Sequence, residues 1–104
     1  MPSYPPRPGL VAACLSSEQA RSSVVDVLEV VELSGERAWL QLSVALAAAT
    51  SVYLRLCLPD VPEHIAAGEV LWSVRDPGKP GHFTGIRFTP PLAEDVLRTF
   101  ADMP

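Results

Sequence analysis

Two arginines and a short acidic turn are the residues of this sequence best suited to binding chemistry. Glu32, Ser34 and Glu36 lie just before Arg37, and Arg7 lies in the proline-rich N-terminal segment. A guanidinium binds phosphate or carboxylate through paired hydrogen bonds and stacks on flat rings. Arg7 and Arg37 are therefore candidates for anion binding, although surface arginines are more often solvated or paired. For Arg37 we expect pairing with Glu32 or Glu36, because both carboxylates lie within five residues of it.

The other reactive side chains form no catalytic or metal-binding pattern. His64 and His82 lie in or beside expected turns, and no Cys/His/Asp spacing of a metal site surrounds them. The serines lack a nucleophile-elbow motif and a placed His/Asp partner. Cys14 and Cys57 lie inside apolar stretches, where buried unreactive thiols are usual. We therefore expect no enzyme activity, no metal and no cofactor.

The elements that must position these residues are short strands between proline clusters. The eleven prolines break helices and central strands alike. Regular alternation is clearest at 51–58, where Val52, Leu54 and Leu56 share one face. Six strands are expected, over residues 10–15, 22–33, 38–42, 51–58, 65–74 and 82–88. Within 22–33 the alternation slips, which predicts a bulge or bend near 28–30.

A single helix is expected over residues 91–101. Pro91 suits a first helical turn, and Leu92, Val96 and Phe100 repeat at four-residue spacing, which predicts one apolar stripe. Six short strands followed by a helix indicate an all-β fold, a six-stranded antiparallel barrel with a C-terminal helix. The residues expected to be largely buried are Val52, Leu54, Leu56, Val70, Trp72, Ile86 and Phe88.

Trp39 alternates out of phase with its apolar neighbours. If Ala38, Leu40 and Leu42 fill the barrel, Trp39 points outward. One interpretation is that the C-terminal helix covers its ring. The other is that Trp39 is an exposed aromatic anchor for a protein partner.

Length and composition limit the classes of protein that fit. The 104 residues suffice for one domain, divided here into a proline-rich arm at 1–9 and a domain at 10–104, and 48% hydrophobic residues are enough for a core. We expect the first seven residues to make few contacts with the barrel. A net charge of −4 argues against general nucleic-acid binding. No run of 18 apolar residues predicts membrane insertion, and two cysteines with no apolar leader favour a cytoplasmic location.

Three segments together resemble the PilZ domain of bacteria, over roughly residues 7–100. They are residues 31–40, with a strand and a serine-containing turn, residues 51–59, with an apolar strand ending in proline, and residues 68–88, which contain Gly-Glu-Val-Leu-Trp and later Gly-Ile-Arg-Phe. PilZ domains are receptors for cyclic di-GMP. The family's Arg-x-x-x-Arg arm holds the phosphates and guanine faces, and its (Asp/Asn)-x-Ser-x-x-Gly turn contacts the guanine edges.

This sequence departs from both ligand motifs. Arg7 has no partner arginine four residues away, since Ser3 and Val11 occupy those positions. In the turn, Ser34 matches, Glu32 replaces the shorter acid or amide, and Arg37 replaces the last glycine. The resemblance therefore implies a degenerate PilZ-like regulatory or adaptor protein in bacterial motility or second-messenger signalling. It would act by protein–protein interaction without binding cyclic di-GMP. The alternative is a cyclic di-GMP receptor with an altered site at Arg7, Glu32, Ser34 and Arg37.

Overall fold

The computed structural model describes residues 2–18 and 21–104 and is mostly β-structure. It holds seven strands and one helix, one strand more than the sequence predicts: β1 (Val11–Glu18), β2 (Arg21–Val25), β3 (Val27–Leu33), β4 (Arg37–Leu42), β5 (Ser51–Leu58), β6 (Val61–Arg75), β7 (His82–Phe88) and α1 (Glu94–Phe100). No helix among the described residues is long and apolar enough to cross a membrane.

The additional strand comes from the stretch expected as one strand over 22–33. The strand is interrupted at Asp26, so that β2 pairs with β1 and β3 pairs with β4. The strand expected at 10–15 runs on to Glu18, because the serines at 16–17 pair with those at 22–23. The expected turn is thus shorter, and its remaining residues, 19–20, lie outside the described part. The irregularity expected near 28–30 is confirmed by register shifts at Val27/Glu29 and Val30/Glu32.

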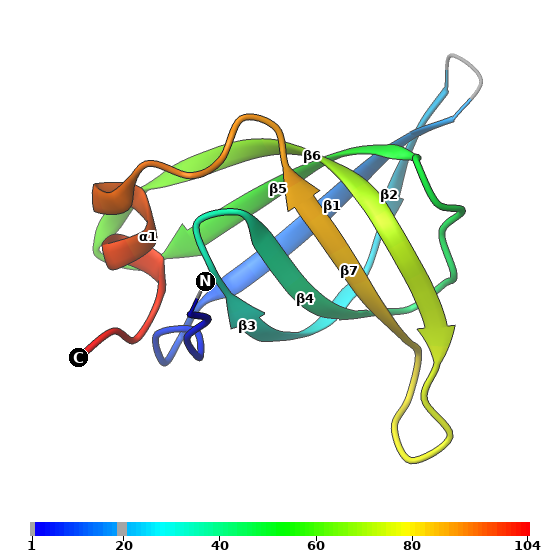
Figure 1. Ribbon diagram of the computed structural model, residues 1–104, viewed down its shortest axis with the longest axis horizontal. Helices are drawn as coiled ribbons and strands as arrows, with labels where there is room; N and C mark the ends of the chain where they lie inside the picture. The colour runs from blue at the N-terminus through cyan, green and yellow to red at the C-terminus, as the bar shows by residue number, and fades with distance from the viewer. Residues whose placement is uncertain (1, 19–20) are drawn as a thin grey trace.

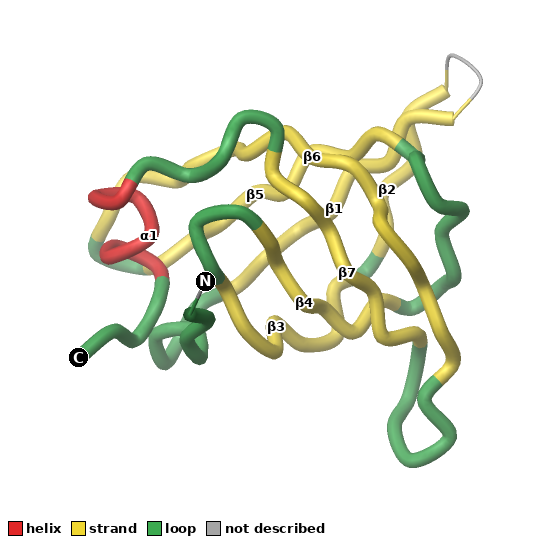
Figure 2. The backbone as a smooth tube through the Cα atoms, in the orientation of Figure 1, coloured by secondary structure: helices red, strands yellow, loops and turns green. Residues whose placement is uncertain are grey.

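All strand pairs are antiparallel, and the sheet order is β2-β1-β5-β6-β7-β4-β3. Figure 1 shows this sheet curling round a core into a half-barrel, with α1 at one end and the β1–β2 hairpin projecting from the other. The strands and loops are distinguished in Figure 2. The outermost strands of the order, β2 and β3, follow each other in the chain.

The core lies on the concave face of this sheet. Six of the seven residues expected to be buried are at most 2% exposed: Val52, Leu54, Leu56, Val70, Ile86 and Phe88. Trp72 is the exception, being only partly buried. The cause is a bulge, since two steps along β6, from Val70 to Trp72, match one step along β7, from Ile86 to Gly85. The extra residue turns Trp72 to the outer face.

The N-terminal arm is docked, so the expectation of few contacts is wrong. Tyr4 and Leu33 exchange two backbone hydrogen bonds, each 2.8 Å long. The Arg7 N–H donates to the carbonyl of Phe100 at 2.9 Å, and the Asp102 N–H donates to the carbonyl of Pro5 at 2.8 Å. Proline removes donors from the arm, yet the non-proline N–H groups and the carbonyls still pair.

The helix begins at Glu94, three residues later than expected. Residues 91–93 form an extended connection, in which the Leu92 N–H donates to the Gly35 carbonyl at 2.7 Å and Ala93 has a ψ of 151°. Within the helix, Leu97 and Phe100 are buried. The expected stripe does face the core, with Phe100 buried and Leu92 and Val96 partly buried against it, and Leu97 is a further buried residue that the four-residue spacing did not include.

Candidate functional site

The serine of the acidic turn holds the β3–β4 hairpin together. Ser34 is 3% exposed, and its Oγ accepts hydrogen bonds from the backbone N–H groups of Arg37, at 3.0 Å, and Glu36, at 3.2 Å. A backbone bond from the Ser34 N–H to the Arg37 carbonyl closes the turn at 2.8 Å. Serine favours such local bonds to the backbone. The hydroxyl is therefore occupied by the fold.

The other residues of the degenerate motifs do not converge on one point. The Glu32 carboxylate accepts a hydrogen bond from the Ser3 hydroxyl, which ties the arm to β3. Arg7 lies farther along the arm and donates from Nη1 to the carbonyl of Thr99 at 3.0 Å. Its side chain therefore binds the end of α1 and does not reach the turn.

Arg37 does not pair with Glu32 or Glu36, so the expected pairing is wrong. Within the described residues its guanidinium makes no hydrogen bond or ion pair. The register explains this, because Glu32 lies opposite Trp39, and Arg37 instead lies opposite Arg87 on β7. Like charges in directly opposite positions destabilise a sheet. Arg87 offsets part of this by an ion pair to Glu69 at 2.8 Å.

The next row of the outer face contains two tryptophans on either side of a glycine. Trp39 of β4 lies opposite Gly85 of β7, and Gly85 lies opposite Trp72 of β6. The Trp72 ring covers the glycine, since a Cβ added at Gly85 would lie 2.7 Å from its Cε2 and Cζ2 atoms. The glycine thus provides the space in which the indole packs against the sheet.

A third row extends the aromatic surface. Phe83 lies two residues before Gly85 on β7, and its ring centroid is 5.2 Å from that of Trp72, in a tilted arrangement typical of aromatic pairs. Opposite Phe83 is Gln41, which is 2% exposed and whose Oε1 has no hydrogen-bond partner among the described residues. We call Trp39, Trp72 and Phe83 the aromatic face.

Both tryptophans of the aromatic face are partly buried, and Arg37 and Arg87 at its end are exposed. The predicted outward orientation of Trp39 agrees with its neighbours, since Ala38 and Leu40 are fully buried. α1 packs against β5 at one end of the sheet (Figure 1). Sequence reasoning missed Arg87 and Trp72. The alternation of Phe83, Gly85 and Arg87 was readable, but the bulge that brings Trp72 beside them was not.

A groove of ≈ 490 Å³ continues from the two arginines. It is lined by Glu36, Arg37, Arg87 and the segment Phe88–Pro91. Two guanidinium groups beside a shallow groove match an anion in charge. Glu36 is the carboxylate among the residues that line this groove. Glu69 is not part of the lining, and it forms the ion pair with Arg87.

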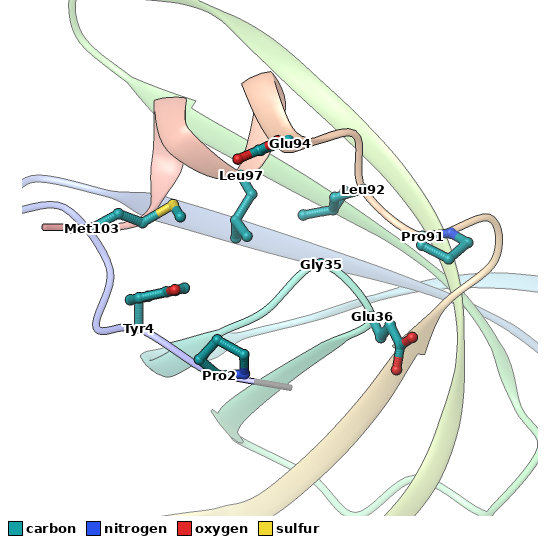
Figure 3. A pocket seen from close by; sticks show the side chains of 9 residues that line it. All are labelled: Pro2, Tyr4, Gly35, Glu36, Pro91, Leu92, Glu94, Leu97 and Met103. Carbon is teal, nitrogen blue, oxygen red and sulfur yellow. The ribbon is translucent and has the colours of Figure 1, made fainter.

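A separate pocket of ≈ 340 Å³ lies where the arm meets the turn and the helix. Figure 3 shows Leu97 pointing down from α1 into the space above Tyr4 and Pro2, with the Leu92 side chain beside it. The polar side chains of its lining are Tyr4, Glu36 and Glu94, so it contains carboxylates and no cation. Its lining also lacks a nucleophile paired with a base.

The remaining reactive side chains serve the packing. Cys14 is 1% exposed, and burial raises the pKa of its thiol from 9.0 to about 11, so it is protonated at neutral pH. Both cysteines are free. His64 packs near the Phe100 ring, with centroids 6.4 Å apart. No group of three or more His, Cys, Asp or Glu side chains gathers in the part of the chain that the structure describes.

The structure thus brings Trp39 and Arg37 to one outer face, together with Glu32 opposite Trp39, leaves Ser34 in the hairpin turn, and separates Arg7 from all of them. Comparison with protein-family models, curated proteins and solved structures finds no match to this chain.

Proposed function

We propose that this chain is a non-enzymatic, PilZ-like regulatory domain that acts by protein–protein interaction, with the aromatic face as its docking surface. The observation that carries the proposal is the row of Trp39, Gly85 and Trp72, continued by Phe83 and bordered by Arg37 and Arg87. Tryptophan and arginine are the residues that most often dominate the binding energy of protein interfaces. An aromatic platform with cations at one end fits a partner that offers apolar side chains beside a carboxylate.

Three features support this proposal over ordinary cyclic di-GMP binding. The Ser34 hydroxyl is occupied by two backbone donors, and Arg7 is bound to the Thr99 carbonyl. The pocket between arm and turn carries two carboxylates, which repel phosphates. By its resemblance to PilZ domains, the protein would act in bacterial motility or second-messenger signalling in the cytoplasm.

A second candidate function rests on a different observation, the apposition of Arg37 and Arg87. An unpaired guanidinium beside a second one, next to two indole rings, has the chemistry to bind a phosphate and stack a base. This would be a cyclic di-GMP receptor whose site keeps only Arg37 of the four residues that the resemblance implies, Arg7, Glu32, Ser34 and Arg37, and adds Arg87. Its ligand would lie on the outer face beside the arginines, away from the acidic pocket.

Affinity capture from extracts of the source organism tests the first candidate. The bait is the full chain in four forms: wild type, Trp39→Ala, Trp72→Ala and the control Val44→Ala, which truncates an apolar side chain that is 47% exposed in the β4–β5 connection. We expect a partner that binds wild type and control and is lost with either tryptophan variant. Equal capture by all four folded baits, or by none, would contradict the aromatic face as the docking surface.

Calorimetry with cyclic di-GMP separates the two candidates. The protein-interaction function predicts no binding heat at micromolar protein and excess ligand. The receptor function predicts binding heat that disappears with Arg37→Ala or Arg87→Ala and persists with Arg98→Ala, a control whose arginine pairs with Glu94 on the helix.

A further inference from the structure

The outer face of β6, β7 and β4, which lie side by side in Figure 1, is arranged in three rows across the strands. The first row places Arg37 opposite Arg87, and the second contains the two indoles of the aromatic face, on either side of Gly85. The third row places Phe83 opposite Val74, which is 52% exposed. Successive rows lie two residues apart along β7, which is a distance of about 6.8 Å. The surface therefore changes along β7 from positive charge to indole rings and then to smaller apolar side chains.

The first row contains two positive charges and one ion pair. The Arg37 guanidinium makes no hydrogen bond or ion pair within the described residues. The Arg87 guanidinium binds Glu69 on β6 at 2.8 Å. Like charges that face each other across a ladder repel. A carboxylate that reaches both guanidinium groups would relieve this repulsion and form charge-assisted hydrogen bonds.

The surroundings of the first row favour a single carboxylate over a polyanion. Glu36 lines the groove together with both arginines, and Glu69 is bound to one of them, so two negative charges balance two positive charges. A locally neutral site gives no net attraction to a ligand with several negative charges. A single carboxylate still gains the paired hydrogen bonds that a guanidinium offers. Because the next two rows are apolar, the complementary group is an Asp or Glu side chain of a peptide that has apolar residues near it.

The spacing of the rows matches an extended peptide better than a helix. In an extended chain the side chains on one side also repeat at about 6.8 Å, so an acid and the residues two and four positions away meet the three rows in turn. A helix repeats its side chains at about 5.4 Å per turn, which puts it out of step by about 3 Å over two rows. Two sheet faces also pack with their strands nearly aligned, which keeps the rows in step.

We propose that the partner presents an extended segment with one carboxylate and with apolar side chains two and four residues away from it. The carboxylate lies between Arg37 and Arg87, and the apolar side chains lie on the indoles and on the row of Phe83. This rests on the proposed function and adds the chemistry and the sequence pattern of the partner. Arg37 then selects acidic partners, and Glu69 competes with the incoming carboxylate for Arg87.

Selection from a phage-displayed library of random peptides tests the pattern. Peptides of about twelve residues are long enough to cross the sheet when extended. The baits are the full chain as wild type, Arg37→Glu, Trp39→Ala and the control Arg98→Glu, which reverses an exposed charge on α1. Wild type and control are expected to enrich Asp or Glu two and four residues from apolar side chains. Arg37→Glu is expected to enrich Lys or Arg at the acidic position, and Trp39→Ala to lose the pattern.

The outcomes separate this inference from the proposed function. Apolar peptides without an acid that are lost with Trp39→Ala would keep the docking surface and overturn the acidic partner. A spacing of three or four residues would indicate a helical partner and overturn the extended segment. No enrichment, or an acidic pattern that survives Arg37→Glu, would also overturn the inference, while affinity capture still decides the proposed function. Circular dichroism checks each fold, and Arg37→Gln, expected to lose the acidic preference, serves if Arg37→Glu fails to fold.

Fluorescence anisotropy with the most enriched peptide then tests the carboxylate site. Arg37→Ala is expected to weaken binding about tenfold, because a charge-assisted hydrogen bond is lost. Glu69→Gln is expected to tighten binding about threefold, because it removes an exposed ion pair that competes for Arg87. The matched control is Glu94→Gln, which frees the exposed Arg98 in the same way and is expected to change nothing. Unchanged binding with Arg37→Ala, or equal effects of Glu69→Gln and Glu94→Gln, would overturn a carboxylate shared by Arg37 and Arg87.

Discussion

Replacing Gly85 by alanine tests whether the glycine exists to seat the Trp72 indole. The added Cβ would lie 2.7 Å from Cε2 and Cζ2 and 3.0 Å from Nε1 of Trp72, closer than carbon atoms pack. These atoms belong to a rigid ring, so relief requires the whole indole to turn away from the sheet. Overpacking of this kind costs about 1–3 kcal/mol. Alanine in a strand recovers about 0.5–1 kcal/mol relative to glycine.

The net expectation for Gly85→Ala is a loss of about 1.5 kcal/mol in the free energy of unfolding. With a urea m-value of about 1.5 kcal/mol/M, the unfolding midpoint falls by about 1 M. Near-UV circular dichroism should also lose intensity, because the tilted packing of Trp72 on Phe83 is disturbed. The control is Gly78→Ala in the β6–β7 turn, where a Cβ would meet only Asp76 Oδ1, at 3.6 Å.

A double-mutant cycle decides the cause. In a Trp72→Ala background the steric conflict is gone, so Gly85→Ala is expected to be neutral or slightly stabilising there. The coupling between the two positions is then about 1–3 kcal/mol. If Gly85→Ala costs the same with and without the indole, the glycine is needed for its backbone, and our account of the aromatic face is refuted at this position.

Three further predictions concern the parts that hold this face in place. Ser34→Ala is expected to lower the free energy of unfolding by about 1–2 kcal/mol in urea titration, because two turn N–H groups lose their acceptor, and Ser34→Thr should restore most of it. Deleting residues 1–7 is expected to cost about 2 kcal/mol in the same titration, since it breaks five backbone hydrogen bonds, four of them to β3 and the C-terminal segment, that offset the cost of ordering the arm; an unchanged midpoint would contradict the docking. Because burial raises the pKa of Cys14 from 9.0 to about 11, the native state binds more protons than the unfolded state in alkaline solution. The free energy of unfolding should therefore fall as pH rises from about 9 to 11, by on the order of 2 kcal/mol, and this slope should vanish in Cys14→Ala; an equal slope in both proteins would rule Cys14 out.

Local alternation predicted the inward faces of the central strands well. Val52, Leu54 and Leu56 alternate without interruption, and β5 is regular over that stretch. Ala38 and Leu40 likewise fixed the outward direction of Trp39. In these strands the period of two is a local property, so the sequence contains it.

The features that the sequence did not predict depend on pairing between distant segments. The bulge after Val70 adds one residue to β6, and nothing in the alternation of Val70, Trp72 and Val74 signals it. The prediction that Arg37 pairs with Glu32 or Glu36 is wrong for a related reason. A short distance along the sequence does not show which residue lies opposite Glu32 in the hairpin, and that residue is Trp39. The arm docks through backbone hydrogen bonds of Tyr4 and its neighbours, and the pattern of side-chain types along the sequence does not predict such bonds.

The bulge in β6 also determines how much outer surface the molecule can use. Before it, β6 presents Ile65 on the outer face, and after it the strand would return Trp72 to the core if alternation from Val70 continued. Trp72 would then face inward opposite Thr84, which is fully buried, and an indole there would overfill the core. One inserted residue therefore relieves the core and supplies the aromatic face at the same time. In a regular ladder that kept Leu71, Leu71 would lie opposite Gly85 and Trp72 opposite the buried Thr84, which is why we regard the bulge as the feature that makes the aromatic face possible.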